Sequence, residues 1–328
     1  MKSLFKKQIE DIINHINVDE KLRIKYGDQD CGDIQKIELY ETSPELFISD
    51  LSNIIYKKAY INSESFKITP SENYEKELAI FTHSLSKTNT TRSKTCRGWV
   101  SKENSSNSDL YIKKNENYKI VKSGQYFITN GVSAFDQSTI SIPLQKENRT
   151  QSFYYFFGEN NSELHETNSL RIYFNLDASA AKNWVHFISS QLNSFQVPFQ
   201  AKCLSHPSLY NRADSAVLYI NKYNYNYVRL ILKENINSFK NGLNNSVPQF
   251  TFQIEDGIAL AESPPIITES FGTSRCKLIS ESIYNSIQNN KGKSEWSKDL
   301  FNKLKYLGFS LEKFYMNPES NFVYKTIN

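Results

Sequence analysis

Apolar side chains recur at helical spacing through most of the first 88 residues. Ile9, Ile12, Ile13 and Ile16 repeat at steps of three and four, and the same steps return around Leu51 and before residue 88. Steps of this size place side chains on one face of an α-helix. We therefore expect an all-helical front section.

The stretch that follows, residues 86–109, is polar and poor in large apolar groups apart from Trp99 and Val100. Such composition is typical of a linker or an exposed loop. It predicts a helical N-terminal region over residues 1–96 and a second domain over residues 97–328.

Beyond this boundary the pattern changes from helical to β. Short β-branched and aromatic segments, broken by Gly, Asn and Pro, predict an antiparallel meander near residues 109–114, 118–127, 138–144 and 152–158. The meander is expected to continue into a strand–helix–strand–strand unit between Leu170 and Ile220. Further helices are predicted over 227–243, 271–287 and around Trp296, with one more strand near 250–254. The predicted fold class is α+β: a helical N-terminal section, then a mostly antiparallel sheet flanked by helices.

Strict alternation in the first strand of this unit separates two sets of side chains. Arg171 and Tyr173 alternate with apolar residues, so both point to one face of the sheet. The same alternation in residues 199–203 lets Lys202 rise beside them from a neighbouring strand. Arg212 precedes a third strand, and Arg275 lies in or near the first turn of a helix.

These residue types suit a phosphate site. Arginine matches phosphate with two parallel hydrogen bonds, and a desolvated lysine can serve as a general base. Strand arginines are also common as solvated charges, and Lys202 and Tyr173 also fit an exposed lysine and a core-edge tyrosine. Spacing alone leaves these readings open.

Composition narrows the function classes. The 328 residues carry 39 basic and 35 acidic side chains, a net charge of +4 that is too small to predict a nucleic-acid partner. No run of eighteen apolar residues occurs, so no membrane span is expected and a cytoplasmic location is predicted. The four cysteines show no CxxC spacing, and no metal site or disulfide framework is predicted.

Familiar cofactor motifs are missing from the sequence. Walker, dinucleotide-binding, kinase, GxSxG and HExxH patterns do not occur. Of the five scattered histidines, His206 is the candidate for catalysis, because it follows Lys202 by four residues and the proline after it favours extended backbone.

Four sequence segments resemble the HopA family, which includes bacterial type III secreted effectors and standalone proteins of peptide natural-product clusters. They are RIYFNL, FQAKCLSHPSLYNRADSAVLYI, GIALAESP and ESFGTSRCKL, and the resemblance spans roughly Trp99 to Ile287. Its most specific parts are the run KCLSHPSLYNRADSAVLY and the segment SFGTSRC. It implies a HopA-like lyase domain like those of class V lanthipeptide and thioamide-peptide biosynthesis. In those pathways a separate kinase resembling aminoglycoside phosphotransferases phosphorylates Ser or Thr of a precursor peptide. The lyase then eliminates phosphate to give dehydroalanine or dehydrobutyrine, and no cofactor or metal is implied.

A more distant similarity to phosphothreonine lyases of the OspF and SpvC type implies roles for single residues. Lys202 matches the proton-abstracting lysine, Arg171 and Arg212 match phosphate-binding residues, and Arg275 is a looser match for a second arginine. The histidine that protonates the leaving phosphate in those lyases aligns with Tyr173. Tyr173 or His206 would then supply that proton, or the phosphate would leave without strong acid assistance.

Three hypotheses follow. The first is a phosphoserine/phosphothreonine lyase acting on a ribosomally made precursor peptide beside its kinase. The second is a non-catalytic module that binds the precursor or the kinase, which the tyrosine at position 173 favours. The third is a secreted effector, which needs an unstructured leader; the helical pattern that begins near Leu4 counts against it.

Overall fold

The structure is a computed structural model. It describes residues 4–31, 37–40, 43–61, 73–92, 95–104, 110–114, 117–121, 127–129, 139–143, 147–150, 152–160, 168–265 and 269–328. His165 lies outside these described residues. The fold combines α-helices with antiparallel sheets, as the sequence predicts.

A seven-stranded antiparallel sheet forms the centre of the molecule. Its strand order is β14-β15-β11-β13-β12-β10-β9. The strands are β9 (Glu147–Arg149), β10 (Phe153–Phe157), β11 (Ser169–Phe174), β12 (Gln200–Leu204), β13 (Ala216–Asn221), β14 (Phe252–Glu255) and β15 (Ile258–Glu262). The predicted strand–helix–strand–strand unit is therefore confirmed as β11, α5, β12 and β13, with β13 lying between the other two strands.

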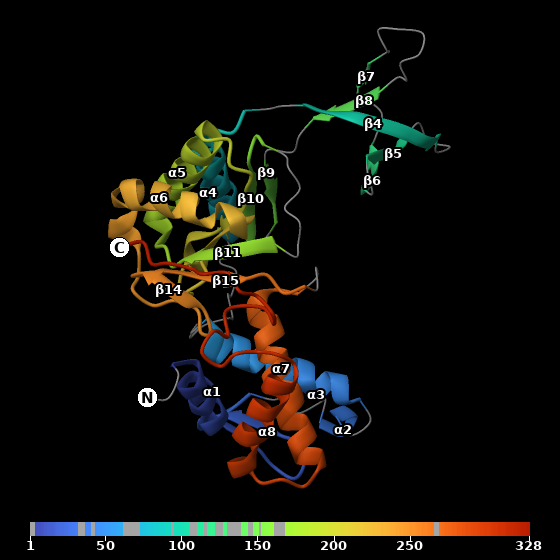
Figure 1. Cartoon of the computed structure of the whole chain (residues 1–328), viewed down its shortest axis with the longest axis vertical. Helices are drawn as coiled ribbons and strands as arrows, with labels where there is room; N and C mark the ends of the chain where they lie inside the picture. Colours follow the sequence, from blue (N-terminus) through green and yellow to red (C-terminus); the bar gives the residue numbers. More distant parts are fainter. Residues whose placement is uncertain are drawn as a thin grey trace.

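Helices cover both faces of this sheet (Figure 1). One group consists of α4 (Tyr74–Thr88), α5 (Ala181–Ser194) and α6 (Tyr225–Asn235). Its α5 packs the ring of Trp184 against Phe156 and Phe174 of the sheet. The other group consists of α1 (Leu4–His15), α2 (Ile37–Tyr40), α3 (Pro44–Ile55), α7 (Phe271–Gln288) and α8 (Lys293–Tyr306).

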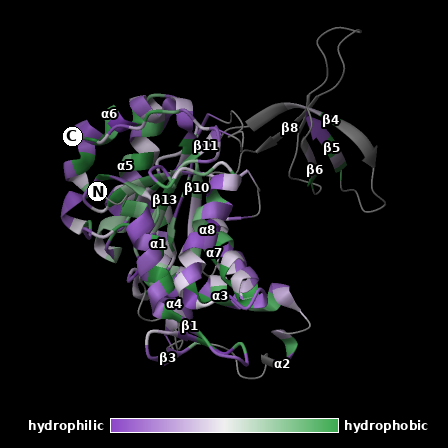
Figure 2. Ribbon diagram, turned by 60° about the horizontal axis from the view of Figure 1, so that its bottom comes forward, coloured by the Kyte–Doolittle hydropathy of each residue, from purple (hydrophilic) through white to green (hydrophobic). Residues whose placement is uncertain are grey.

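The second helix group joins the two ends of the chain. The N-terminal α3 packs along α7, and α1 packs against α8. Hydrophobic and hydrophilic positions alternate along these helices (Figure 2), as expected where one face of each is buried. Helices are confirmed at the start of the chain, but the strands β1 (Ile16–Val18), β2 (Ile24–Tyr26) and β3 (Gln29–Asp30) also lie there. The division at residue 97 remains a prediction, and the N-terminal helices pack mainly on C-terminal ones.

A second sheet stands apart from the rest of the molecule (Figure 1). Its order is β6-β5-β4-β8-β7, with β4 (Thr95–Asn104), β5 (Leu110–Lys114), β6 (Asn117–Val121), β7 (Phe127–Thr129) and β8 (Thr139–Pro143). Trp99, Ile112 and Val121 form its small buried cluster. The predicted linker is therefore wrong over residues 95–104, because the backbone supplies the ladder hydrogen bonds and Trp99 supplies the apolar anchor. The predicted meander is likewise two sheets rather than one.

One short turn and two backbone hydrogen bonds connect the N-terminal section to the segments around the central sheet. A π-helical turn, η2 (Tyr56–Tyr60), follows α3 directly. The backbone nitrogen of Gln249 donates to the carbonyl of Tyr60 at 3.0 Å, and that of Ala213 donates to the carbonyl of Ile61 at 3.2 Å. These two bonds fix η2 against the sheet.

Candidate active site

Strand register places Tyr173 and Lys202 on one face of the central sheet. Tyr173 of β11 and Lys202 of β12 both pair with Val217 of the intervening β13. Arg171 is two residues before Tyr173, and it pairs with Tyr219 in the next row of the same face. The predicted common face for Arg171, Tyr173 and Lys202 is confirmed. Strands lie about 4.8 Å apart, so the Cα atoms of Tyr173 and Lys202 are roughly 10 Å apart.

Lys202 is half-buried against aromatic rings. Its Nζ lies 4.0 Å from the ring centroid of Phe153 and 5.9 Å from that of Tyr155, both on the adjacent β10. A ring face attracts a cation, so these rings hold the end of the Lys202 side chain beside β10.

Arg212 and Asp214 form a bidentate ion pair on the loop before β13. Arg212 Nε donates to Asp214 Oδ1, and Nη2 donates to Oδ2 at 2.7 Å. The Tyr56 hydroxyl of η2 donates to Asp214 Oδ2 at 3.1 Å and accepts from Arg212 Nη2 at 3.2 Å. Burial alone would raise the pKa of Asp214, but the charges of Arg212 and Lys202 lower it. Lys202 thus lies within the electrostatic field of this pair.

Tyr173 is buried in a group of side chains that also contains Arg171, Tyr56 and Tyr60. Its side chain is 4% exposed, and burial raises the pKa of Tyr173 to about 12, although Arg171 and Tyr60 act in the opposite direction. Burial also raises the pKa values of Tyr56 and Tyr60 well above the usual value for a phenol. All three phenols therefore stay neutral near pH 7 and offer O–H donors.

The guanidinium group of Arg171 is held by hydrogen bonds to residues that follow β15. Its Nε donates to Ser263 Oγ at 3.0 Å, and Nη2 donates to the carbonyl of Glu269 at 3.1 Å. The guanidinium carbon lies 5.4 Å from the ring centroid of Tyr219. These contacts hold the cation over the sheet beside Tyr173.

Arg275 lies within electrostatic range of Tyr60 and Tyr173, but its guanidinium group donates its hydrogen bonds elsewhere. It lies in the first turn or so of α7, as predicted, but its side chain is 1% exposed. Its Nε and Nη2 each donate at 3.0 Å to the carbonyls of Phe314 and Met316. The rings of Phe271, Phe309 and Phe314 surround the guanidinium group within about 5 Å. These contacts show how Arg275 holds the C-terminal segment in place.

His206 lies at the end of β12 and is held by α4. The Ser208 backbone N–H donates to its Nδ1 at 3.2 Å, and Ser208 Oγ lies 2.8 Å from the same nitrogen. The other nitrogen, Nε2, lies 3.2 Å from Glu77 Oε2, and the ring stacks on Tyr74 with centroids 4.1 Å apart. The described side-chain contacts of His206 are with α4 and Ser208, not with Lys202 or Tyr173.

The tyrosines Tyr56 and Tyr60 and the carboxylate of Asp214 were missed by sequence reasoning. Both tyrosines lie four residues apart in YKKAY, and a π-helical turn at that position is a frequent mark of a functional site. Asp214 is part of the RAD run that carries Arg212. Its position two residues after an arginine was the available signal.

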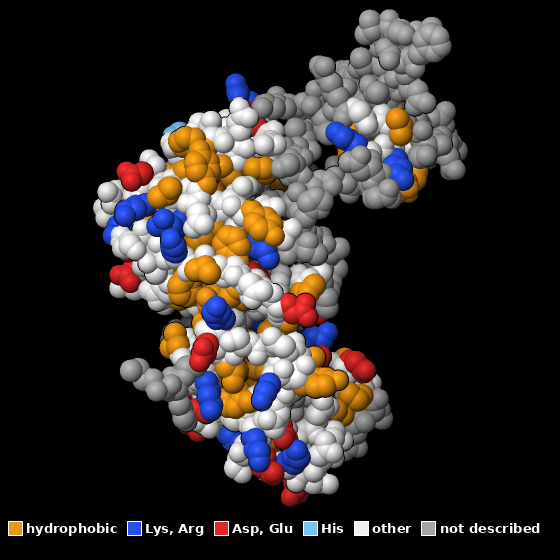
Figure 3. Space-filling view, viewed as in Figure 1, with side chains coloured by type: hydrophobic (Ala, Val, Ile, Leu, Met, Phe, Trp, Pro, Cys, Tyr) orange, Lys and Arg blue, Asp and Glu red, His pale blue; other side chains and the backbone are white. Residues whose placement is uncertain are grey.

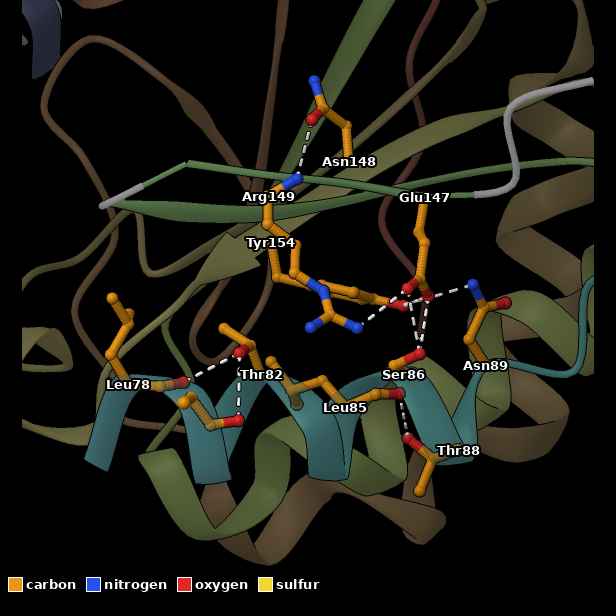
Figure 4. Close-up of polar contacts among 11 residues, drawn as sticks. Leu78, Thr82, Leu85, Ser86, Thr88, Asn89, Glu147, Asn148, Arg149 and Tyr154 are labelled. Atoms are coloured by element: carbon orange, nitrogen blue, oxygen red, sulfur yellow. Dashed lines mark hydrogen bonds and ion pairs between the residues drawn. The ribbon is translucent and has the colours of Figure 1, made fainter. Parts of the chain in front are cut away.

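The edge of the sheet near this site is tied to α4 by one carboxylate (Figure 4). Glu147 of β9 accepts from Ser86 Oγ at 2.8 and 2.9 Å, from the Tyr154 hydroxyl at 2.8 Å and from Arg149 Nη2 at 2.9 Å. Burial would raise the pKa of Glu147, but these hydrogen bonds lower it. This cluster holds β9 and β10, and β10 supplies the rings beside Lys202.

On the face seen in Figure 3, the Lys and Arg side chains of the described residues are interspersed with Asp and Glu side chains. Among the described residues, no helix combines the length and apolar character that crossing a bilayer requires.

This chain is similar to one protein family and to solved structures of two effector proteins. No curated protein matches the sequence. Among solved structures, an effector protein from Pseudomonas syringae pv. syringae strain 61 aligns with a TM-score of 0.49 and 14% identity over 96% of this chain and 98% of that one. An effector protein from P. syringae pv. tomato strain DC3000 aligns with a TM-score of 0.45 and 13% identity, over 83% and 90% of the two chains. The model of the HopA1 effector protein family matches residues 144–321, more than half of the sequence, and the chain belongs to this family.

Proposed function

We propose that this protein is a phosphoserine/phosphothreonine lyase that converts phosphorylated residues of a ribosomally made precursor peptide into dehydroalanine or dehydrobutyrine. The observation that carries the proposal is the shared sheet face of Lys202, Tyr173 and Arg171, with Arg212 paired to Asp214, whose pKa Lys202 also lowers. A base, a neutral donor and two guanidinium groups are the set that such an elimination uses.

Each residue has one role in this proposal. Lys202 removes the Cα proton of the phosphorylated residue, and the Cβ–oxygen bond breaks as the double bond forms. Arg171 and Arg212 stabilise the charge of the departing phosphate. Tyr173, a neutral phenol on the same face, donates the proton to the leaving oxygen. Tyr173 is preferred to His206 as the acid because the described contacts of His206 lead away to α4.

Lys202 acts as a base in its neutral form. In the structure its Nζ lies against the Phe153 ring, and the Arg212 guanidinium group offsets the charge of the nearby Asp214 carboxylate. Movement of Lys202 away from Phe153 toward the substrate would remove the ring contact. Arg275 is left out of the proposed site because it is enclosed by rings and bound to two carbonyls.

The substrate and partner follow from the resemblance rather than from a described surface. A separate kinase resembling aminoglycoside phosphotransferases would supply the phosphorylated precursor. The protein would act after that kinase in the cytoplasm.

Mass spectrometry of a phosphoserine precursor peptide tests the proposal. Incubation with the purified protein should remove one phosphoric acid from the peptide, and Lys202→Ala should abolish that loss. The matched control is Lys233→Ala, which removes an exposed lysine of α6. A well-folded Lys202→Ala protein that still eliminates phosphate would overturn the assignment of the base.

A second candidate is a phosphopeptide-binding module without catalysis. Two contacts favour it: the ammonium group of Lys202 rests on Phe153, and Arg212 is already paired with Asp214. In that case the same incubation would show tight binding with unchanged peptide mass. A role as a secreted effector, to which the family's name refers, would instead require a host protein as the phosphorylated substrate.

A further inference from the structure

Tyr60 is a buried tyrosine that comes from outside the central sheet. It is the last residue of η2 and is 2% exposed. Its ring lies 5.1 Å from that of Tyr56, 6.3 Å from that of Phe271 and 6.4 Å from that of Phe250, measured between centroids. With the backbone bonds of residues 60 and 61, this packing holds the ring in one place.

The hydroxyl group of Tyr60 makes no hydrogen bond of ordinary geometry with any described residue, although it is fully buried. Buried polar groups are nearly always paired, because an unpaired one loses its bonds to water without replacement. An exception of this kind calls for a reason, and a group used only when substrate is bound is one such reason. The hydroxyl of Tyr56, one turn earlier, does form hydrogen bonds, with Asp214 and Arg212.

The nearest polar groups identify what Tyr60 can act on. Its hydroxyl lies close enough to that of Tyr173 for each to alter the pKa of the other. The titratable or charged groups that interact electrostatically with Tyr173 include Arg171 of β11, Tyr219 of β13, Tyr56 and Tyr60 of η2, Arg275 of α7 and Asp214 of the loop before β13. The two guanidinium groups and the Tyr60 donor favour the phenolate.

We propose that Tyr60 is a positioning residue for the elimination, and that its hydroxyl donates a hydrogen bond to the phenolic oxygen of Tyr173 as Tyr173 gives its proton to the leaving phosphate. This inference rests on the proposed lyase activity. The Tyr60 donor and the Arg171 guanidinium then occupy the lone-pair side of the Tyr173 oxygen, and the O–H of Tyr173 is turned toward the substrate.

The step balances in protons and electrons. Lys202 takes the Cα proton, the C–H electron pair forms the double bond, and the Cβ–oxygen pair leaves with phosphate. The phosphate oxygen accepts the Tyr173 proton. The resulting phenolate is stabilised by Tyr60 and Arg171 until a proton returns from solvent, and Lys202 releases its own proton to solvent.

A titration that needs no activity tests the hydrogen bond. Tyr173 is replaced by 3,5-difluorotyrosine, whose phenol ionises much closer to neutral pH, and its absorbance is followed against pH with and without Tyr60→Phe. Loss of the Tyr60 donor should raise the pKa of the fluorinated phenol by about half a unit or more. Tyr40→Phe is the matched control, because Tyr40 is also buried in the N-terminal section but donates to Asp50. An unchanged pKa in Tyr60→Phe would overturn the inference whatever the activity.

Leaving-group dependence tests the catalytic part. Tyr60→Phe should slow elimination from a phosphoserine peptide by about 10-fold, within the range of assisted proton transfer. It should slow elimination from an O-sulfoserine peptide much less, because sulfate leaves without protonation. Equal losses on both peptides would count against the proposal. If the unmutated protein eliminates from neither peptide while the titration shift is present, the lyase assignment fails and the hydrogen bond stands.

The variant should fold, because phenylalanine keeps the packed ring and removes only the hydroxyl. Loss of the interaction with Tyr173 should lower the melting temperature little, as for a single hydrogen bond. A marked fall in melting temperature would show that the ring itself is displaced and would count against a role confined to the hydroxyl.

Discussion

Gly272 leaves no room for a side chain beside Tyr60. A Cβ atom built on Gly272 would lie 2.3 Å from Cε1 of Tyr60 and 2.6 Å from its Cζ. The glycine of the SFGTSRC segment is thus explained by contact with an aromatic ring 212 positions earlier in the chain. Any larger residue must push Tyr60 out of its place over the sheet.

Gly272→Ala should therefore disturb the site as well as the fold. Forcing one extra carbon into a packed core costs about 1–3 kcal/mol of unfolding free energy. We expect that loss in a denaturant titration, together with reduced elimination from the phosphopeptide. Gly292→Ala is the control, since a Cβ there meets only Ser294 Oγ, at 3.9 Å. Full activity in a folded Gly272→Ala protein would show that the position of Tyr60 does not matter.

Asp214→Asn should lower stability most at neutral pH. The substitution leaves the buried Arg212 without its charged partner, which costs about 3–5 kcal/mol when a buried pair is broken. Because the pKa of Asp214 is lowered in the folded state, its contribution is present above the ordinary carboxyl pKa of about 3.9 and is lost as the pH falls through the folded value. The difference between the two proteins in unfolding free energy should thus shrink below about pH 4. A difference that grows on acidification would contradict the assignment.

Glu147→Gln should loosen the edge of the sheet. The uncharged amide keeps the shape but weakens the bonds from Ser86, Tyr154 and Arg149, which predicts a loss of roughly 1–3 kcal/mol in unfolding free energy. The pKa of Glu147 is lowered on folding, so this loss should also fade as the solution becomes acidic. Hydrogen exchange of the β9 and β10 amides should rise in the variant. Unaltered exchange there would mean that Glu147 does not hold these strands.

Arg275→Lys separates a structural from a phosphate-binding role. Lysine cannot reach both the Phe314 and Met316 carbonyls with a planar fork, so we expect a loss of about 2–3 kcal/mol in stability. At a temperature where the variant is folded, KM for the phosphopeptide should change little. A large rise in KM without a fall in melting temperature would instead restore Arg275 to the phosphate site.

The sequence predicted the face of the sheet because that face depends on local alternation. Arg171 and Tyr173 differ by two positions in one strand, and Lys202 obeys the same rule in the next strand of the unit. The strand order that brings Tyr173 and Lys202 to the same row could not be read from local alternation. It depends on β13 inserting between the other two strands.

Contacts between residues far apart in the sequence explain why some roles were not predicted from the local pattern. Arg275 was placed correctly in its helix, but the rings of Phe309 and Phe314 that enclose it lie more than 30 positions later. Nothing in the local sequence pattern marks Tyr56 and Tyr60, because their contacts come from segments more than 100 positions away. Trp99 lay in a polar run whose neighbours gave no β alternation, so β4 was missed.

The π-helical turn also divides the site between two parts of the sequence. The family match covers residues 144–321, which include the lysine and both arginines, while Tyr56 and Tyr60 lie before it. Substitutions at these two tyrosines would leave Lys202, Arg171 and Arg212 in place. In the proposed lyase, such substitutions would change how the leaving group is protonated without any change in the central sheet.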